Sequence, residues 1–150
     1  MEFEATALIP APPEDVFEFL CDLENHWRLT GRHVNVVSLN GDRDGGTVQI
    51  RGPLGIRRTA RTKVTASRGP RLIIGVAELP SGTRARVSWT LAGRMNQTRV
   101  KLAADVERAA VVDRLVLALG GRAWMTRMFE RALGRLADRF SEQRQPTPVP

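Results

Sequence analysis

The first thirty residues show a strand pattern followed by a helical pattern. Between Phe3 and Ile9, apolar residues alternate with polar ones, which predicts a half-buried strand. Residues 10–15 contain three prolines and two acidic residues. Proline ends a strand and suits the first turn of a helix, which acidic groups also favour. We therefore expect a helix over residues 13–23, followed by a helical turn or loop through Trp27 and Leu29.

Residues 33–107 alternate between short strand patterns and turn signals. The turn signals lie at residues 40–46, 52–55, 68–70, 80–82 and 93–97. Most strands between them have one polar and one apolar face, but residues 72–79 are apolar on both faces, so the orientation of that strand stays open. Short connections favour sequential antiparallel pairing, and the apolar face of the resulting sheet needs a cover.

That cover is predicted over residues 110–141, where apolar residues recur at helical spacing. Gly120 and Gly121 interrupt the pattern, and each glycine costs a helix about 1 kcal/mol relative to alanine. We expect a break there and a main helix over residues 122–141. Residues 142–150 are rich in proline, which predicts a flexible tail.

Composition narrows the class of protein. A chain of 150 residues, 42% hydrophobic and 26% charged, suits one globular domain. Its one cysteine, Cys21, excludes an intramolecular disulfide and a cysteine-rich zinc site. The sequence does not open with a basic-then-apolar leader, and no apolar run approaches the roughly 18 residues typical of a membrane span. These features predict a soluble, cytoplasmic, single-domain protein.

The net charge of +7 is unevenly distributed. Residues 1–27 carry seven acidic side chains and no Lys or Arg, so the rest of the chain sums to +14. Residues 51–71 contain seven basic residues and no acidic one, a pattern that attracts polyanions. However, arginine is common throughout the later segments, and no nucleic-acid-binding motif accompanies the charge. We therefore do not expect nucleic acid as a partner.

The order of elements and several short segments resemble the START / polyketide cyclase–lipid transport (SRPBCC) superfamily. The segments are the strand-to-helix opening over residues 9–24, the turn Gly69-Pro70-Arg71-Leu72, the start of the last strand at Gln97-Thr98-Arg99-Val100, and the Arg-rich amphipathic C-terminus. The resemblance spans residues 1–141 as a single domain. It implies an α+β helix-grip fold, in which a curved antiparallel sheet of about seven strands wraps around the long C-terminal helix, with a short helical segment after the first strand.

The same resemblance implies a hydrophobic cavity between the sheet and the C-terminal helix. A curved sheet and a straight helix cannot touch everywhere, so bulky side chains or a guest molecule must fill the gap. Methionine and aromatic residues suit a pocket for irregular apolar molecules, although each of them also fits ordinary core packing. The candidate lining residues are Phe17, Trp27, Trp89, Leu91, Trp124, Met125, Met128, Phe129 and Leu133.

Arg58 is the most informative polar residue, because it falls on the apolar phase of its strand. A buried guanidinium is costly unless it is paired. Glu78 is the nearest partner if its strand turns Leu72, Ile74 and Val76 inward; the alternative is that Arg58 lies near the sheet end and reaches water. Thr62, on the same face, is a candidate hydrogen-bond donor to a ligand, with local bonding as its alternative.

Other reactive side chains carry weaker signals. Cys21 is interpreted as a small buried hydrophobic residue. His26 and His33 are seven residues apart, which fits no helical metal pair, and surface placement is expected for both. The sequence contains no nucleophile elbow, P-loop, dinucleotide fingerprint or zinc-protease motif, and it has no tyrosine. We expect no metal and no cofactor, and we assign no catalytic residue.

These observations favour the binding or transport of a hydrophobic small molecule, such as a lipid, an isoprenoid or a polyketide. Apolar area would supply affinity, and Arg58, with Glu78, would orient a polar group of the ligand. The alternative is a polyketide aromatase/cyclase- or dehydrase-like enzyme, in which Arg58 with Glu78, or His33, assists proton transfer.

Peripheral membrane contact is a third hypothesis. Residues 115–128 combine bulky apolar groups with basic ones, as interfacial helices do, and the basic neighbours are Arg114, Arg122 and Arg127. The loop over residues 52–55 is a second candidate contact. The sequence specifies neither the ligand nor the oligomeric state.

Overall fold

The structure is a computed structural model that describes residues 2–22, 25, 29, 34–39, 45–51 and 57–144. Seven strands form one antiparallel sheet, as predicted. Their order in the sheet is β1-β7-β6-β5-β4-β3-β2. The sheet is therefore a meander from β2 to β7, with β1 added beside β7. The strands are β1 (Glu2–Ile9), β2 (Val34–Leu39), β3 (Gly45–Arg51), β4 (Arg57–Arg68), β5 (Leu72–Glu78), β6 (Arg84–Arg94) and β7 (Gln97–Arg108).

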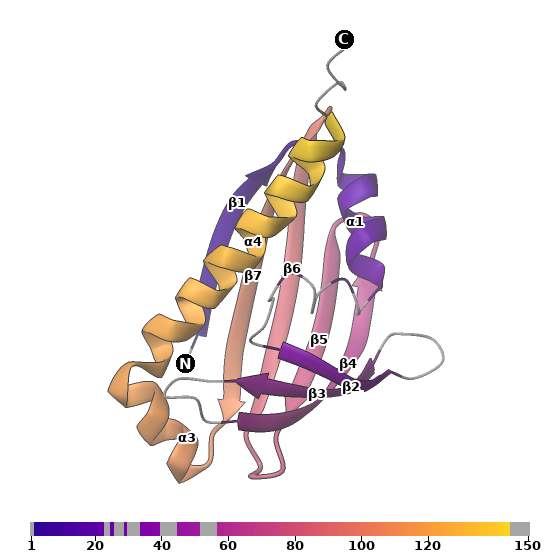
Figure 1. The fold of residues 1–150 in the computed structure, drawn as a ribbon. Helices are drawn as coiled ribbons and strands as arrows, with labels where there is room; N and C mark the ends of the chain where they lie inside the picture. Colours follow the sequence, from indigo (N-terminus) through magenta and orange to yellow (C-terminus); the bar gives the residue numbers. More distant parts are fainter. Residues whose placement is uncertain are drawn as a thin grey trace.

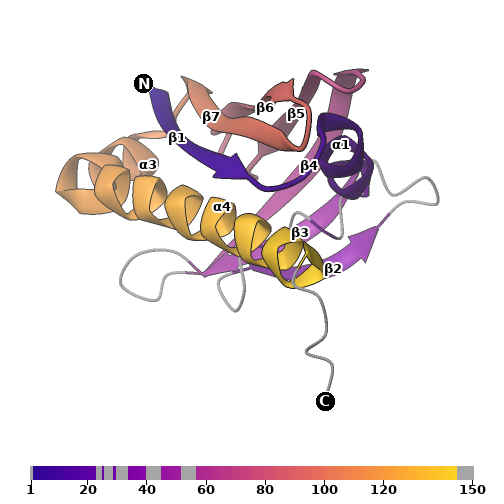
Figure 2. The ribbon, with the colours of Figure 1, turned by 90° about the horizontal axis from the view of Figure 1, so that it is seen from above.

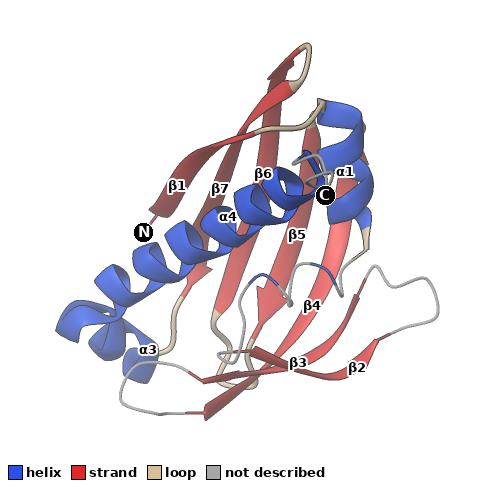
Figure 3. Cartoon of the chain, turned by 45° about the horizontal axis from the view of Figure 1, so that its top comes forward, coloured by secondary structure: helices blue, strands red, loops and turns tan. Residues whose placement is uncertain are grey.

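Helices lie on one side of this sheet. They are α1 (Pro13–Cys21), α3 (Val111–Val116), the π-helical segment η3 (Leu117–Gly121) and α4 (Arg122–Arg144). The long helix α4 crosses the concave face of the sheet, and α1 lies beside its C-terminal end (Figure 1, Figure 2). Colouring by secondary structure shows one helical layer against one curved sheet, which is the predicted α+β helix-grip fold (Figure 3). Helix α4 continues to Arg144, past the expected end at residue 141; residues 145–150 lie outside the described residues.

Helix α1 begins where the prolines and acidic residues predict. Pro12 is its extended N-cap, Pro13 is the first helical residue, and Glu14 and Asp15 lie in the first turn. Val16 and Leu20 are one turn apart, and both are buried in the core. The helix ends at Cys21, slightly before the expected boundary.

The predicted break before the main helix occurs at Leu119 and Gly120. Leu119 has φ −92° and ψ 21°, and Gly120 has φ 114° and ψ −5°, so the helical path is interrupted. Glycine adopts positive φ without the steric cost of a Cβ. As a result, α3 and α4 point in different directions, and α3 lies beneath the start of α4 in Figure 1.

Strand β5, whose orientation the sequence left open, turns Ile73 and Ala77 towards the interior. Ile73 is buried and Ala77 lines an internal cavity, whereas Glu78 is exposed. Side chains of a strand alternate between faces, so Ile74 and Val76 lie on the outer face. This differs from the arrangement that Glu78 needs in order to reach Arg58.

The interior has a solid half and a hollow half. Near α1, side chains pack closely: Ile9, Val16, Leu20 and Leu136 are at most 1% exposed. The buried Thr98 hydroxyl donates a 2.7 Å hydrogen bond to the Ala11 carbonyl, which fixes the chain between β1 and α1. Beside the first half of α4, the same interior opens into a cavity.

Candidate ligand-binding site

The cavity lies between the inner face of the sheet and the first half of α4, and it has a volume of about 270 Å³. Most of its wall is aliphatic or aromatic, as in typical small-molecule sites. The lining residues are Phe3, Ile50, Arg58, Ala60, Ala77, Leu79, Thr83, Ala85, Val87, Trp89, Leu102, Ala104, Val106, Asp113, Val116, Leu117, Gly121, Trp124, Met125, Met128, Phe129 and Ala132.

Two elements carry most of this wall. Along β6, alternate residues face the cavity, from Ala85 through Val87 to Trp89. Along α4, residues at helical spacing do the same, from Gly121 through Met125 to Ala132. Both series lead away from the β5–β6 turn and α3, so the cavity has one end at that turn and another beside Trp89.

Charged and hydroxyl groups gather at the first of these ends. Nη1 of Arg58 lies 2.5 Å from Oδ1 of Asp113, and the two side chains are 23% and 12% exposed. Oδ2 of Asp113 accepts hydrogen bonds from the Ser81 hydroxyl, at 3.0 Å, and from the Thr83 hydroxyl. The Thr83 oxygen in turn accepts the Ala110 N–H at 3.0 Å. This polar network joins α3 to β4 and to the β5–β6 turn.

Asp113, rather than Glu78, is the partner of Arg58. Glu78 lies on the outer face of the sheet, where it accepts a 2.6 Å hydrogen bond from Arg84. The alternation of β5 is the reason, because Ala77 takes the inward position.

Thr62 and Glu78 lie apart from the cavity. The Thr62 hydroxyl donates to the Gly46 carbonyl at 3.4 Å, which is the local bonding that the sequence left as an alternative. Thr62 and Glu78 border a separate hollow of about 430 Å³, together with Arg61, Lys63 and Arg84. Neither residue is therefore part of the ligand-binding surface that we propose below.

The apolar candidates divide between the hollow and the solid halves of the interior. Trp89, Met125 and Phe129 line the cavity, as do the further candidates Trp124 and Met128. Leu91 and Leu133 instead belong to the solid core, at 4% and 1% exposure. Phe17 packs against that core from α1. Trp27 lies outside the described residues, as do His26, His33 and residues 52–55.

Sequence reasoning missed Asp113. The sequence holds one sign that Asp113 faces the cavity. Val116 and Leu117 follow it by three and four positions, so all three side chains lie on one face of the helix. Both of those neighbours line the cavity, so this face of α3 and η3 is directed inward. A carboxylate on an inward face needs donors, and Arg58 supplies the opposite charge.

Cys21 is exposed, which corrects the expectation that it is buried. Loss of hydration around the thiol, and secondly the nearby Glu18 carboxylate, raise the pKa of Cys21 above its ordinary value. The thiol is therefore protonated at neutral pH, and it lies away from the cavity wall.

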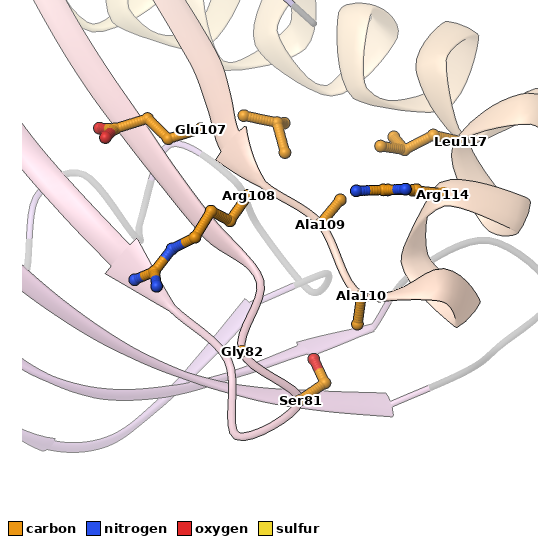
Figure 4. Close-up of a pocket in the computed structure, with 9 residues that line it drawn as sticks. Ser81, Gly82, Glu107, Arg108, Ala109, Ala110, Arg114 and Leu117 are labelled. Carbon is orange, nitrogen blue, oxygen red and sulfur yellow. The ribbon is translucent and has the colours of Figure 1, made fainter.

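A second concavity, a surface groove of about 520 Å³, adjoins the polar end of the cavity. Ser81 and Gly82 of the β5–β6 turn form one side, and Ala110 and Arg114 the other (Figure 4). Val106 and Leu117 border both the groove and the cavity. Within the described ranges, no group of three or more His, Cys, Asp or Glu side chains could hold a metal ion. None of the described helices combines the length and apolarity that crossing a membrane requires.

Comparison with known families identifies the fold. A sequence model described as "Polyketide cyclase / dehydrase and lipid transport" matches residues 1–141. The chain belongs to this family. A search of curated proteins found no sequence match to this chain.

Solved structures whose sequences have low identity to this chain share its fold. The protein TTHA0849 from Thermus thermophilus is 21% identical, with a TM-score of 0.67 over 97% of this chain and 100% of that one. A START superfamily protein from Mycobacterium smegmatis is 14% identical, with a TM-score of 0.68 over 95% and 98% of the two chains. DynU16, a protein in the dynemicin biosynthetic locus, is 18% identical, with a TM-score of 0.59 over 97% of this chain and 48% of DynU16.

Proposed function

We propose that this protein binds and carries a small hydrophobic molecule in the cavity between the sheet and α4. The single observation that carries this proposal is the cavity itself, an apolar volume with one polar end. An apolar guest in this cavity would remove the apolar side chains of its wall from water and make dispersion contacts with them. Membership of a family described by polyketide and lipid chemistry supports the same class of ligand.

The volume favours a compact guest. An engineered cavity of about 150 Å³ in another protein holds one benzene molecule. At about 270 Å³, this cavity suits a bicyclic aromatic or a short isoprenoid better than a lipid with two long acyl chains. A small aromatic polyketide or an isoprenoid is therefore the ligand class that we propose.

Arg58, Trp89, Met125 and Phe129 are the predicted residues that we propose as ligand contacts, because all four line the cavity. Trp89 and Phe129 would bury apolar ligand surface, while the thioether of Met125 adapts to its shape. Thr62, Glu78, Leu91 and Leu133 drop out of the proposed site for the reasons given above.

Native mass spectrometry of the freshly purified protein, followed by organic extraction, tests this function. We expect a bound species that raises the intact mass and appears in the extract as an apolar compound with few ionisable groups. An unliganded protein that also takes up no aromatic probe at millimolar concentration contradicts the carrier function.

Cyclase- or dehydrase-like catalysis is a second candidate, favoured by the Arg58–Asp113 pair on the cavity wall. In this scheme the cavity folds a flexible substrate into a reactive geometry, and Arg58 polarises a carbonyl oxygen. Turnover of a model polyketide that is lost in Arg58→Leu supports catalysis. Release of the same compound unchanged supports the carrier.

We also propose that α3 and η3 contact an anionic bilayer when the ligand is exchanged. Four large apolar side chains are exposed on this short segment, and Val116 and Leu117 beside them line the cavity. Exposed Arg108, Arg114 and Arg122 surround the segment and complement anionic headgroups. The four apolar side chains are Val111, Val112, Leu115 and Leu119.

We expect the protein to act in the cytoplasm, where a lone thiol such as that of Cys21 stays reduced.

A further inference from the structure

The polar end of the cavity is specific enough to select a chemical class of ligand. Among the described residues that line the cavity, the charged or hydroxyl-bearing side chains are Arg58, Thr83 and Asp113, and all three belong to one network. The tryptophan indoles apart, the other side chains on the described part of the wall contain only carbon and sulfur, and Gly121 contributes backbone. A polar group on the ligand therefore finds its charged partner at this end.

The network balances its own charge. Asp113 is the partner that the described residues give to Arg58, and their atoms lie 2.5 Å apart. Asp113 also accepts from Ser81 and Thr83, so both of its oxygens are engaged. The described part of the site is thus a neutral ion pair in an apolar wall. A second anion placed there would face the Asp113 carboxylate, and none of the other described lining residues carries a positive charge that could neutralise it.

Donor capacity remains on the guanidinium. An arginine side chain carries five N–H donors, and the contact with Asp113 is made through Nη1. The Thr83 hydroxyl, by contrast, donates to Asp113 and accepts from the Ala110 N–H. Arg58 is therefore the group in this network that can donate to a ligand, and an ionised donor makes a strong hydrogen bond to a neutral oxygen.

The following inference rests on the proposed function. We propose that the cavity selects neutral apolar molecules bearing a ketone, aldehyde or ester carbonyl. The carbonyl oxygen accepts a hydrogen bond from Arg58, and the carbon skeleton extends towards Trp89 and Phe129. A carboxylic acid of the same shape is rejected, because it is ionised at neutral pH and meets Asp113. Asp113 is thus a specificity-determining residue that sets the charge of the accepted ligand.

Three probes of matched shape test this selection: 2-acetylnaphthalene, 2-naphthoate and 2-ethylnaphthalene, titrated calorimetrically at pH 7.5. We expect the ketone to bind at least about tenfold more tightly than the carboxylate and several-fold more tightly than the hydrocarbon. Asp113→Asn leaves the Arg58 charge without its partner, so the affinity for naphthoate should rise at least about tenfold. Arg58→Leu should abolish the advantage of the ketone over the hydrocarbon. Arg57→Leu, on the outer face of the same strand, should leave all three affinities unchanged.

The outcomes separate this inference from the function beneath it. If ethylnaphthalene binds, and the wild type has equal affinities for naphthoate and for the ketone, the selection by charge is overturned while the carrier function stands. If Asp113→Asn, shown by circular dichroism to be folded, keeps the wild-type order of affinities, the role of Asp113 is overturned. If none of the three probes binds, the carrier function fails, and this inference fails with it.

Discussion

Arg58 on β4 and Asp113 on α3 form an ion pair with an N–O distance of 2.5 Å at the end of an apolar cavity. The contact spans the gap between the sheet and the segment that precedes α4. It therefore both fixes the position of α3 and supplies the charged group that a ligand meets.

A double-mutant cycle measures the strength of this pair. We expect Arg58→Leu and Asp113→Asn each to lower the free energy of unfolding, with a coupling of about 1–3 kcal/mol between them, because both groups are mostly buried. Urea denaturation of the wild type, the two single variants and the double variant gives the coupling. Arg84 with Glu78, which is more exposed, is the matched control and should couple by less than about 1 kcal/mol. Equal coupling in the two pairs would show that burial does not strengthen the Arg58–Asp113 pair.

Two glycines should respond to alanine in opposite ways. A Cβ at Gly93 would overlap the ring of Pro13, so Gly93→Ala must displace α1 from β6 and should cost about 1–3 kcal/mol. A Cβ at Gly134, in the middle of α4, meets no atom within 4 Å. Gly134→Ala should therefore raise stability by about 1 kcal/mol through helix propensity. Thermal unfolding distinguishes them, and a stable Gly93→Ala variant would show that α1 does not pack as described.

The raised pKa of Cys21 predicts slow thiol chemistry at neutral pH. The fraction of thiolate is lower than in a free thiol, so reaction with a disulfide reagent at pH 7.5 should be slower than for glutathione, and the rate should rise at a higher pH. Glu18→Gln removes the smaller cause of the raised pKa and should raise the rate, while Glu14→Gln on the same helix should not. A Cys21 that reacts faster than glutathione at pH 7.5 contradicts the stated environment.

If α3 contacts a bilayer, an added negative charge should weaken membrane binding only when it lies on α3. Val112→Asp or Leu115→Asp should reduce sedimentation with phosphatidylglycerol-containing vesicles at low salt by about fivefold or more, because each places a carboxylate on the apolar surface. Leu8→Asp, on an equally exposed position of β1, should sediment like the wild type. Equal losses in all three variants, or no sedimentation of the wild type, would exclude a membrane role for α3.

Much of the fold follows from local patterns. The alternation in residues 57–68 places Arg58 inward and Arg57 outward, and the Gly120-Gly121 pair marks the break before α4. These features depend on strand and helix periods and on glycine, which act over a few residues.

The partner of Arg58 could not be predicted in the same way. Strand β5 is apolar on both faces, so its phase carries no signal, and Asp113 becomes a neighbour only when α3 folds back against the β5–β6 turn. Likewise, nothing local separates Leu133 from Ala132 and Phe129. All three are buried in one core cluster, but only Phe129 and Ala132 also border the cavity, and which side chains do so depends on the tertiary packing around α4.

Binding of a small apolar molecule in the hollow half of the interior can be checked by one calorimetric comparison. Ala85→Phe adds a phenyl ring to the cavity wall between Ala77 and Val106. A cavity that holds one benzene molecule measures about 150 Å³, so this ring takes up much of the space that a bicyclic ligand needs. Ala92→Phe makes the same change at an exposed position of β6. If the cavity is the ligand site, 2-acetylnaphthalene should bind the wild type and Ala92→Phe with one site and equal affinity, and Ala85→Phe should lose at least about tenfold in affinity. Equal binding to all three proteins would show that the ligand does not occupy this cavity.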